Sequence, residues 1–402
     1  MKILMITIEL PYPPTSGGRM KSWNMIKYLS KHHDTSLACL IKYGDQDIQA
    51  FEDSINLKAF LSKPAVNDIR SAKNLIKSYI AGVPINVFRN CQKTLASDIS
   101  AIANDYDVIL LDHYESAQFI PQNFQGKVAF HAHNATYLMW QRFSQSDAPI
   151  PYRIVAALES KRVINYEKKV CQLADLIFAS PNDIDHLEDI GIDRSKCRIT
   201  YHLGDDSQLT LPDMAFEETK KQLLYIGTLN WEANIDGLLW FLNEVWPKVY
   251  STDNEITLKI VGKNPDIRLL DAAKDHSGIE FTGFVEELEP LFKESRLFLA
   301  PLRFGSGIKV KVLNAMCRGI PVITTDVGAE GIDVSNGVHL IIENEAEKMA
   351  HSILKYLEAK EQWQIIAKNS RNIIREKYNW EIVLGDMSDE LLRLQDNQIN
   401  NA

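Results

Sequence analysis

Short apolar runs alternate with helical apolar spacing along most of the chain. Residues 3–8, 107–111 and 127–131 are almost entirely apolar, as strands covered on both faces of a parallel sheet are. Between such runs, apolar residues recur about every three or four positions, which is typical of amphipathic helices. This alternation predicts an α/β fold with parallel, doubly wound sheets. Strands are expected at 3–8, 36–41, 107–111, 127–131, 176–179 and 199, and then at 223–226, 256–261, 279–281, 297–300, 320–324 and 338–342.

The helical patterns complete two such sheets. Helices are expected at 19–31, 69–80, 93–104, 152–173 and 182–190, and then at 235–245, 288–294, 308–319, 345–357, 361–377 and 380–394. A length of 402 residues also suggests two domains. We expect an N-terminal domain at 1–204, a polar linker at 205–221 and a C-terminal domain at 222–378. The helix in 379–402 has no place in the second sheet and is expected to pack back on the first domain.

One stretch of the second domain has the anatomy of a phosphate site. The apolar run 297–300 is followed by a Gly-Ser-Gly loop at 305–307, by a helix that starts near Ile308 and ends at Gly319, and by another strand. A glycine loop lets a ligand approach the backbone, and the free N–H groups at a helix N-terminus favour an anion. The pattern therefore predicts an anion site, although a solvated edge of an ordinary βαβ unit remains the alternative.

Three basic residues strengthen that prediction. Arg303 precedes the loop, and Lys309 and Lys311 are expected in the first helical turn. Cations at a helix N-terminus are locally unfavourable. Together they suggest a countercharge that is not part of the chain.

Composition narrows the class of protein. The net charge of −9 argues against a nucleic-acid binder. The five cysteines are scattered, without a disulfide framework or zinc spacing, so a reducing compartment is expected. We see neither a signal peptide nor an apolar run long enough for a membrane helix. The sequence predicts a cytoplasmic protein, with peripheral contact to the inner face of the membrane left open.

With these pieces in place, the chain resembles a family four glycosyltransferase of the GT-B type (glycosyl transferases group 1), which has two Rossmann-like domains facing a central crevice. The resemblance covers nearly the whole chain and is strongest between residues 224 and 331. It rests on the segments 225–231 (YIGTLNW), 258–262 (LKIVG), 281–285 (FTGFV), 301–303 (PLR), 305–309 (GSGIK), 315–316 (AM), 319–322 (GIPV) and 328–331 (GAEG). In the N-terminal domain, 16–18 (SGG) and 133–134 (HN) fall where the family places its acceptor-side glycine loop and pocket histidine.

The resemblance implies transfer of a sugar from a nucleotide-sugar donor with retention of anomeric configuration. The donor, UDP- or GDP-linked, would bind the C-terminal domain, and a glycan or lipid-linked acceptor the N-terminal domain, in cell-surface polysaccharide or glycoconjugate biosynthesis. No cofactor and no metal are expected. His133, Arg303 and Lys309 are the implied catalytic residues. The implied donor-binding residues are Gly17, Gly18, Gly227, Asn230, Arg303, Gly305, Ser306, Gly307, Ile308, Lys309, Lys311, Asn314 and Glu330.

Departures from the family pattern leave a second interpretation open. The usual pair of glutamates is replaced by Ser306 and Asn314, and the usual basic residues after the first strand of the donor domain by Asn230, Trp231 and Asn234. A catalytically weak nucleotide-sugar-binding partner subunit is therefore the alternative. An epimerase of the same fold would need more acidic and basic residues in its crevice than we can assign there.

Several further residues are weaker candidates. His131 is a lesser alternative to His133, and Asp112, His113 and Glu115 end a strand that could line the acceptor side. Two Asp-x-Asp patterns, at 45–47 and 183–185, match the metal motif of the other large glycosyltransferase fold. The first lies in a polar loop and the second opens a helix, so we do not assign a metal to either.

Overall fold

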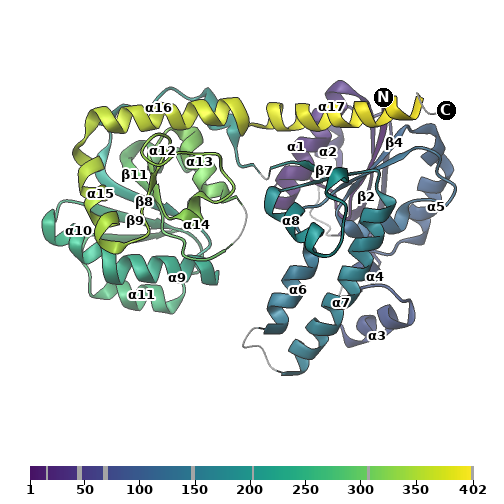
Figure 1. The fold of residues 1–402 in the computed structure, drawn as a ribbon, viewed down its shortest axis with the longest axis horizontal. Coiled ribbons are helices and arrows are strands. Elements are labelled where there is room, and N and C mark those ends of the chain that lie inside the picture. The colour runs from purple at the N-terminus through teal and green to yellow at the C-terminus, as the bar shows by residue number, and fades with distance from the viewer. Residues whose placement is uncertain are drawn as a thin grey trace. The chain divides into compact units, whose positions relative to one another are not determined.

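The computed structural model describes residues 1–14, 17–42, 48–66, 71–145, 150–201, 203–305 and 308–399 (Figure 1). The chain forms two compact units. Unit 1 comprises Met1–His202 together with Val383–Ala402, and unit 2 comprises Leu203–Ile382.

Unit 1 is built on a seven-stranded sheet in the order β3-β2-β1-β4-β5-β6-β7. Every neighbouring pair is parallel. The chain starts at the central strand, fills one side and then returns to fill the other, which is the doubly wound arrangement predicted from the apolar runs. The strands are β1 (Lys2–Ile6), β2 (Asp34–Ile41), β3 (Phe60–Pro64), β4 (Val108–Asp112), β5 (Lys127–His131), β6 (Leu176–Ala179) and β7 (Cys197–Ile199).

Helices connect these strands, and two of them form a long hairpin. Helices α6 and α7 pack against each other and extend beyond the sheet, next to α3 (Figure 1). The core of unit 1 is formed by apolar side chains of the strands and of α5, α7 and α8. The helices are α1 (Gly17–His32), α2 (Ile48–Ser54), α3 (Ala72–Ile80), α4 (Ile85–Arg89), α5 (Lys93–Ile102), α6 (Thr136–Gln145), α7 (Ile150–Leu173) and α8 (Pro181–Asp189).

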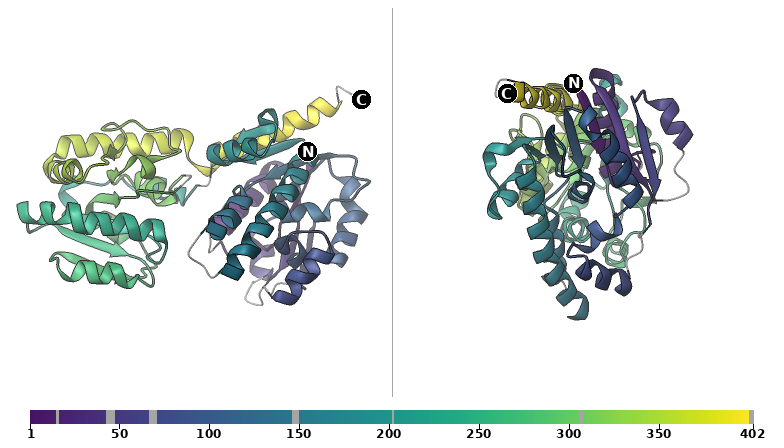
Figure 2. Two further views of the ribbon diagram at one scale, coloured as in Figure 1. Left: turned by 60° about the horizontal axis from the view of Figure 1, so that its bottom comes forward. Right: turned by 90° about the vertical axis from the view of Figure 1, so that its right-hand side faces the viewer.

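Unit 2 has a six-stranded parallel sheet in the order β10-β9-β8-β11-β12-β13. Helices cover both of its faces, as the left view of Figure 2 shows. Its strands are β8 (Lys220–Ile226), β9 (Thr257–Val261), β10 (Ile279–Gly283), β11 (Ser295–Ala300), β12 (Val322–Thr324) and β13 (Ile341–Ile342). Its helices are α9 (Glu232–Trp240), α10 (Trp246–Thr252), α11 (Ile267–Lys274), α12 (Glu289–Glu294), α13 (Val310–Arg318), α14 (Asp326–Ala329), α15 (Ala346–Glu358) and α16 (Lys360–Lys377).

Two predicted boundaries can be placed in this structure. The segment 205–221, expected as a linker, lies in unit 2, where the buried Arg371 guanidinium donates to the carbonyls of Leu209 and Leu211. The last helix, α17 (Trp380–Ile399), groups with unit 1 from Val383 onward. Its Ser388 hydroxyl lies 2.7 Å from His33 Nε2, and its Glu390 carboxylate 2.6 Å from Arg198 Nε.

Some elements differ from the prediction. The helix expected at 235–245 begins at Glu232 and passes through a π-helical turn at Phe241–Val245 before α10. The helix expected from Ile308 begins at Val310, so Lys309 is its N-cap and lies outside its first turn. In the described part of the chain, no helix is long and apolar enough to span a bilayer.

Candidate functional site

Each sheet has one point where the strand order reverses. In unit 1 it lies between β1 and β4, and in unit 2 between β8 and β11. Ligands of open α/β sheets bind beyond the carboxyl ends of the strands at such points. The residues that follow these four strands are therefore the first place to look for a site in each unit.

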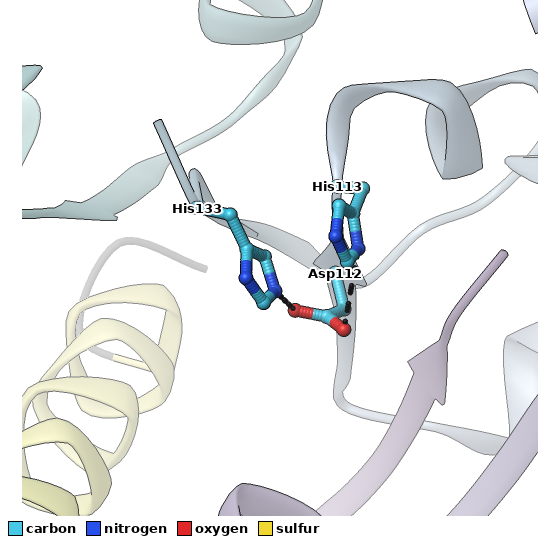
Figure 3. Close-up of side chains that lie close together, drawn as sticks. All are labelled: Asp112, His113 and His133. Atoms are coloured by element: carbon cyan, nitrogen blue, oxygen red, sulfur yellow. Dashed lines mark hydrogen bonds and ion pairs between the residues drawn. The ribbon is translucent and has the colours of Figure 1, made fainter. Parts of the chain in front are cut away.

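In unit 1, Asp112 is the last residue of β4. Its carboxylate forms hydrogen bonds with side chains from β5, from the loop after β5 and from α1. His131 Nδ1, at the end of β5, lies 2.7 Å from Asp112 Oδ1. His133 Nε2, two residues beyond β5, lies 2.7 Å from the same oxygen, as Figure 3 shows. The Ser22 hydroxyl of α1 donates to Asp112 Oδ2 at 2.6 Å. Asp112 and His131 are fully buried. A buried carboxylate is tolerated because these donors satisfy it.

The surroundings determine which groups carry charge. Burial alone would raise the pKa of Asp112, but the nearby His133 and His113 rings hold it well below its usual range. Burial lowers the pKa of His131 to about 4, with a further contribution from Lys21, and burial also lowers the pKa of His133. His133 is therefore neutral, donates through Nε2 to Asp112, and keeps Nδ1 as a hydrogen-bond acceptor.

His113 completes the cluster from an unusual backbone position. Its φ is +74°, in the left-handed region that non-glycine residues seldom adopt. Its Nδ1 lies 3.5 Å from Asp112 Oδ2. Burial alone would lower the pKa of His113, but Asp112 and Glu115 raise it above its usual value.

Part of this cluster has the composition of a metal site. Asp112, His113 and His133 present ligand atoms within 4.8 Å of one another. However, the rings of His113 and His133 stack 3.8 Å apart with only 11° between their planes. An imidazole nitrogen binds a metal in the plane of its ring, so two parallel rings cannot both point at one ion. The geometry favours a hydrogen-bond network, in which Asp112 orients His133.

The two predicted glycines, Gly17 and Gly18, lie at the start of α1. Gly17 opens α1, and a Cβ on Gly18 would lie 4.0 Å from His133 Nδ1. The buried Lys21 follows on the same helix. Burial lowers the pKa of Lys21 to about 8, while the charges of Asp112 and Asp183 oppose that shift. Sequence reasoning missed Lys21 and Ser22, because nothing in a helical pattern marks which residues face a carboxylate from another strand.

In unit 2 the predicted anion site lies at the carboxyl end of β11. Arg303 follows that strand, is half exposed, and has its Nε 3.7 Å from Asp236 Oδ2. Lys309 caps α13 and is buried, with its Nζ 3.4 Å from Glu330 Oε2. Gly305 between them has φ +134°, a conformation open to glycine. The expectation that the countercharge lies outside the chain is therefore wrong in part, because Asp236 and Glu330 supply some of it.

Lys311, also predicted for this site, points into the unit. Its Nζ donates to Asn234 Oδ1 at 2.7 Å and to Tyr225 Oη at 3.0 Å, and lies 4.5 Å from the centre of the Tyr225 ring. Burial, with Lys309 adding repulsion, lowers the pKa of Lys311 to about 7. Asn234 in turn donates to the Thr228 carbonyl, so this lysine holds the loop after β8 against α13.

A cavity of about 470 Å³ lies beyond β8, β9 and β10. The predicted residues Gly227 and Asn230 line it, together with Lys263 and Phe284. The Phe284 ring is exposed, and Lys263 Nζ lies 3.8 Å above it. A flat aromatic surface with a cation beside it suits a planar ligand group.

The remaining predicted residues are placed as follows. Asn314 Oδ1 accepts a hydrogen bond from the Asp205 amide at 3.1 Å, which holds the side chain against that loop. The Ile308 side chain lies against Gly331, where an added Cβ would approach to 2.9 Å. Ser306 and Gly307 lie outside the described residues.

The two Asp-x-Asp patterns have different outcomes. Residues 45–47 lie outside the part of the chain that the structure describes. Asp183 Oδ1 accepts from the Ala135 amide at 2.8 Å, and Asp185 pairs with Arg194. The second pattern therefore serves the packing of α8, whose N-cap is Ser180.

Comparison with known proteins places these sites in a family context. Residues 220–359 match the family model described as glycosyl transferases group 1. A Klebsiella pneumoniae protein described as an uncharacterized 44.6 kDa protein in the cps region is 23% identical over 97% of this chain and 99% of its own length. An uncharacterized glycosyltransferase of Methanocaldococcus jannaschii is 28% identical over 41% of this chain and 43% of its own.

Solved structures agree with this family at the level of the fold. Anabaena HepE in complex with UDP-glucose superposes with a TM-score of 0.65 at 14% identity, covering 98% of this chain and 100% of that one. Sucrose-phosphate synthase from Thermosynechococcus elongatus gives 0.66 at 15% identity, covering 98% and 99%. The predicted resemblance is confirmed at this level. The chain has the GT-B fold, and its residues 220–359 form a domain of the glycosyl transferases group 1 family.

Proposed function

We propose that this protein is a retaining glycosyltransferase that moves a sugar from a nucleoside diphosphate sugar to a glycan or lipid-linked acceptor in the assembly of a cell-surface polysaccharide. The observation that carries the proposal is the anion site of unit 2. Arg303, Lys309 and the N-terminus of α13 gather at the switch point of a glycosyltransferase-family domain. Such a site stabilises the negative charge that develops on a leaving diphosphate.

The cavity beside it suits the nucleoside part of the donor. Phe284 offers a ring face, and Asn230 and the backbone around Gly227 offer polar groups. We favour a uridine nucleotide, because HepE, which shares the fold, was crystallised with UDP and with UDP-glucose. A guanosine nucleotide is the alternative. The diphosphate chemistry proposed here uses side chains and backbone amides and needs no metal ion.

In unit 1 we propose that His133 serves the sugar-transfer step as a neutral hydrogen-bonding group. Asp112 fixes its ring through Nε2, at 2.7 Å, so that Nδ1 accepts from a hydroxyl. Gly18 lies beside that ring, since a Cβ added to it would lie 4.0 Å from His133 Nδ1. We further propose a cytoplasmic location for the enzyme.

Slow donor hydrolysis tests this proposal without knowledge of the acceptor. Purified protein incubated with UDP-sugars or GDP-sugars should release the nucleoside diphosphate. Arg303→Ala and Lys309→Ala should each lower kcat/KM for hydrolysis by about tenfold to a hundredfold, as expected from losing one charge-assisted contact. Lys368→Ala, an exposed lysine of α16, is the matched control and should hydrolyse donor like the wild type. Equal rates in all four proteins would refute the phosphate assignment.

A second candidate function is a nucleotide-sugar-binding subunit without transfer activity. It is favoured by Asn314, whose side-chain oxygen is committed to the Asp205 amide and which carries no charge. Donor binding without any release of nucleoside diphosphate would select it.

A further inference from the structure

Large apolar side chains are exposed at one end of unit 1. They lie on α3, on the second half of α6 and on the first turns of α7, which extend beyond the sheet together (Figure 1). Within α7, Ile150, Ile154 and Leu158 recur at every fourth residue and so form a stripe along one face of the helix, whereas Tyr152 lies on another face. We call this set the hairpin surface: Ile76, Tyr79 and Ile80 on α3, Met139 and Phe143 on α6, and Ile150, Tyr152, Ile154 and Leu158 on α7.

The degree of exposure is large for side chains of this type. Ile80 is 83% exposed, Ile150 68% and Ile154 56%. Single exposed apolar residues are ordinary, but many large ones at the same end of a unit mark an interaction site.

The helices that carry the hairpin surface are firmly held. The Arg162 guanidinium of α7 donates to the Ser78 carbonyl of α3 at 2.8 Å and lies 3.8 Å from the centre of the Tyr79 ring. The buried Glu167 carboxylate accepts from the Thr136 and Tyr137 amides and so caps α6. The exposed stripes therefore belong to fixed helices.

Among the described residues of these three helical segments, the charged side chains are of one sign. Described residues 72–80, 136–145 and 150–158 contain no acidic side chain, and they carry four basic residues. Lysine and arginine beside exposed aliphatic side chains are the composition of helices that lie in a bilayer interface. The whole chain, in contrast, has a net charge of −9. The basic residues are Lys73, Lys77, Arg142 and Arg153.

We propose that the hairpin surface docks on an anionic phospholipid bilayer. A bilayer interface accepts separate apolar stripes that no single protein groove needs to match, and anionic headgroups complement basic residues with no acid among them. The net negative charge of the chain would repel such a bilayer elsewhere, which selects this end of unit 1. The inference extends the proposed function, because a bilayer would present a lipid-linked acceptor, but bilayer binding itself does not depend on the transfer reaction.

Vesicle flotation tests the proposal with the purified full-length chain and no nucleotide. The protein should float with vesicles of phosphatidylcholine mixed with phosphatidylglycerol, and much less with phosphatidylcholine alone. Ile154→Glu should weaken binding by about tenfold or more, because a charge replaces buried apolar surface. Lys77→Glu should weaken it by about fivefold for each unit of charge lost, and added salt should act in the same direction.

The matched controls lie on α16 in unit 2. Ile365 is 56% exposed, as Ile154 is, so Ile365→Glu makes the same change as Ile154→Glu but away from the hairpin surface. Lys368→Glu is the corresponding control for Lys77→Glu. Both controls should float like the wild type. Thermal unfolding verifies that each variant is folded, and Lys77→Glu carries the test should Ile154→Glu fail to fold.

Three outcomes would overturn the proposal. The first is that wild type does not bind anionic vesicles, and the second is that wild type and Lys77→Glu bind them equally. The third is that wild type binds no vesicles but forms a dimer in light scattering, and that Ile154→Glu abolishes this dimer. The last would assign the hairpin surface to a second copy of the chain. Because donor hydrolysis is measured separately, either proposal can fail without the other.

Discussion

At the residue scale, both switch points hold buried charged side chains whose neighbours set their protonation. Asp112 stays ionised because three donors face it, and its carboxylate in turn keeps His133 in one orientation. Lys311 is the opposite case. Its hydrogen-bond partners, Asn234 and Tyr225, are neutral, so no opposite charge offsets the cost of burying its own. Burial opposes the charge of both residues, but only Asp112 has neighbours that outweigh this cost.

The Lys311 pKa predicts a pH dependence of stability. In the folded state this pKa is lowered to about 7, so between about pH 7 and pH 10 the unfolded chain binds more protons than the folded one. The free energy of unfolding should therefore rise with pH in this window, by up to about 1.4 kcal/mol per pH unit.

Lys311→Met isolates this contribution. Urea unfolding of wild type and Lys311→Met at pH 7, 8 and 9 should show wild type gaining stability relative to the variant as pH rises. Parallel curves would mean that Lys311 keeps its charge when buried.

At the element scale, α13 is defined by both of its ends. Lys309 caps its N-terminus beside the proposed diphosphate, and Gly319, with φ +86°, closes its C-terminus in the left-handed conformation. A Cβ on Gly319 would lie 2.7 Å from Arg371 Cδ. The C-terminal end of α13 is therefore packed against the arginine that holds residues 208–213 in unit 2.

Gly319→Ala should accordingly destabilise the protein by more than backbone strain alone. The left-handed conformation costs an alanine about 1 kcal/mol, and displacing Arg371 should add about 1–2 kcal/mol by loosening its buried hydrogen bonds. Gly337→Ala is the matched control, since Gly337 has φ +75° and nothing within 4 Å of an added Cβ. Equal losses in the free energy of unfolding would show that Arg371 adapts without cost.

At the scale of the whole molecule, the sequence predicts the sheets better than the sites. Apolar cores such as those of 127–131 and 176–179 identify inner strands to the residue, because such strands are covered on both faces. The edge strand β3 (Phe60–Pro64) is only partly buried and was missed. Helices α6 and α11 were missed because few of their residues are buried.

The sites depend on packing between distant residues, which one sequence does not reveal. The glycine loop and Lys309 could be found from a local pattern. That Asp112 would gather Ser22, His131 and His133 could not, because those residues come from separate elements. The spacing of Ile150, Ile154 and Leu158 is also that of a core stripe, and only the structure shows them exposed.

A thermal-shift screen against nucleoside diphosphates and their sugars tests the central claim, a donor site in unit 2, most directly. Binding to the folded state alone stabilises it by about 2.7 kcal/mol at a hundredfold excess over Kd, which corresponds to a rise in Tm of about 5–10 °C for a unit of this size. We expect this rise with uridine or guanosine diphosphates, and its loss in Lys309→Ala. No shift with any nucleotide, or an undiminished shift in both Arg303→Ala and Lys309→Ala, would contradict the site at the N-terminus of α13.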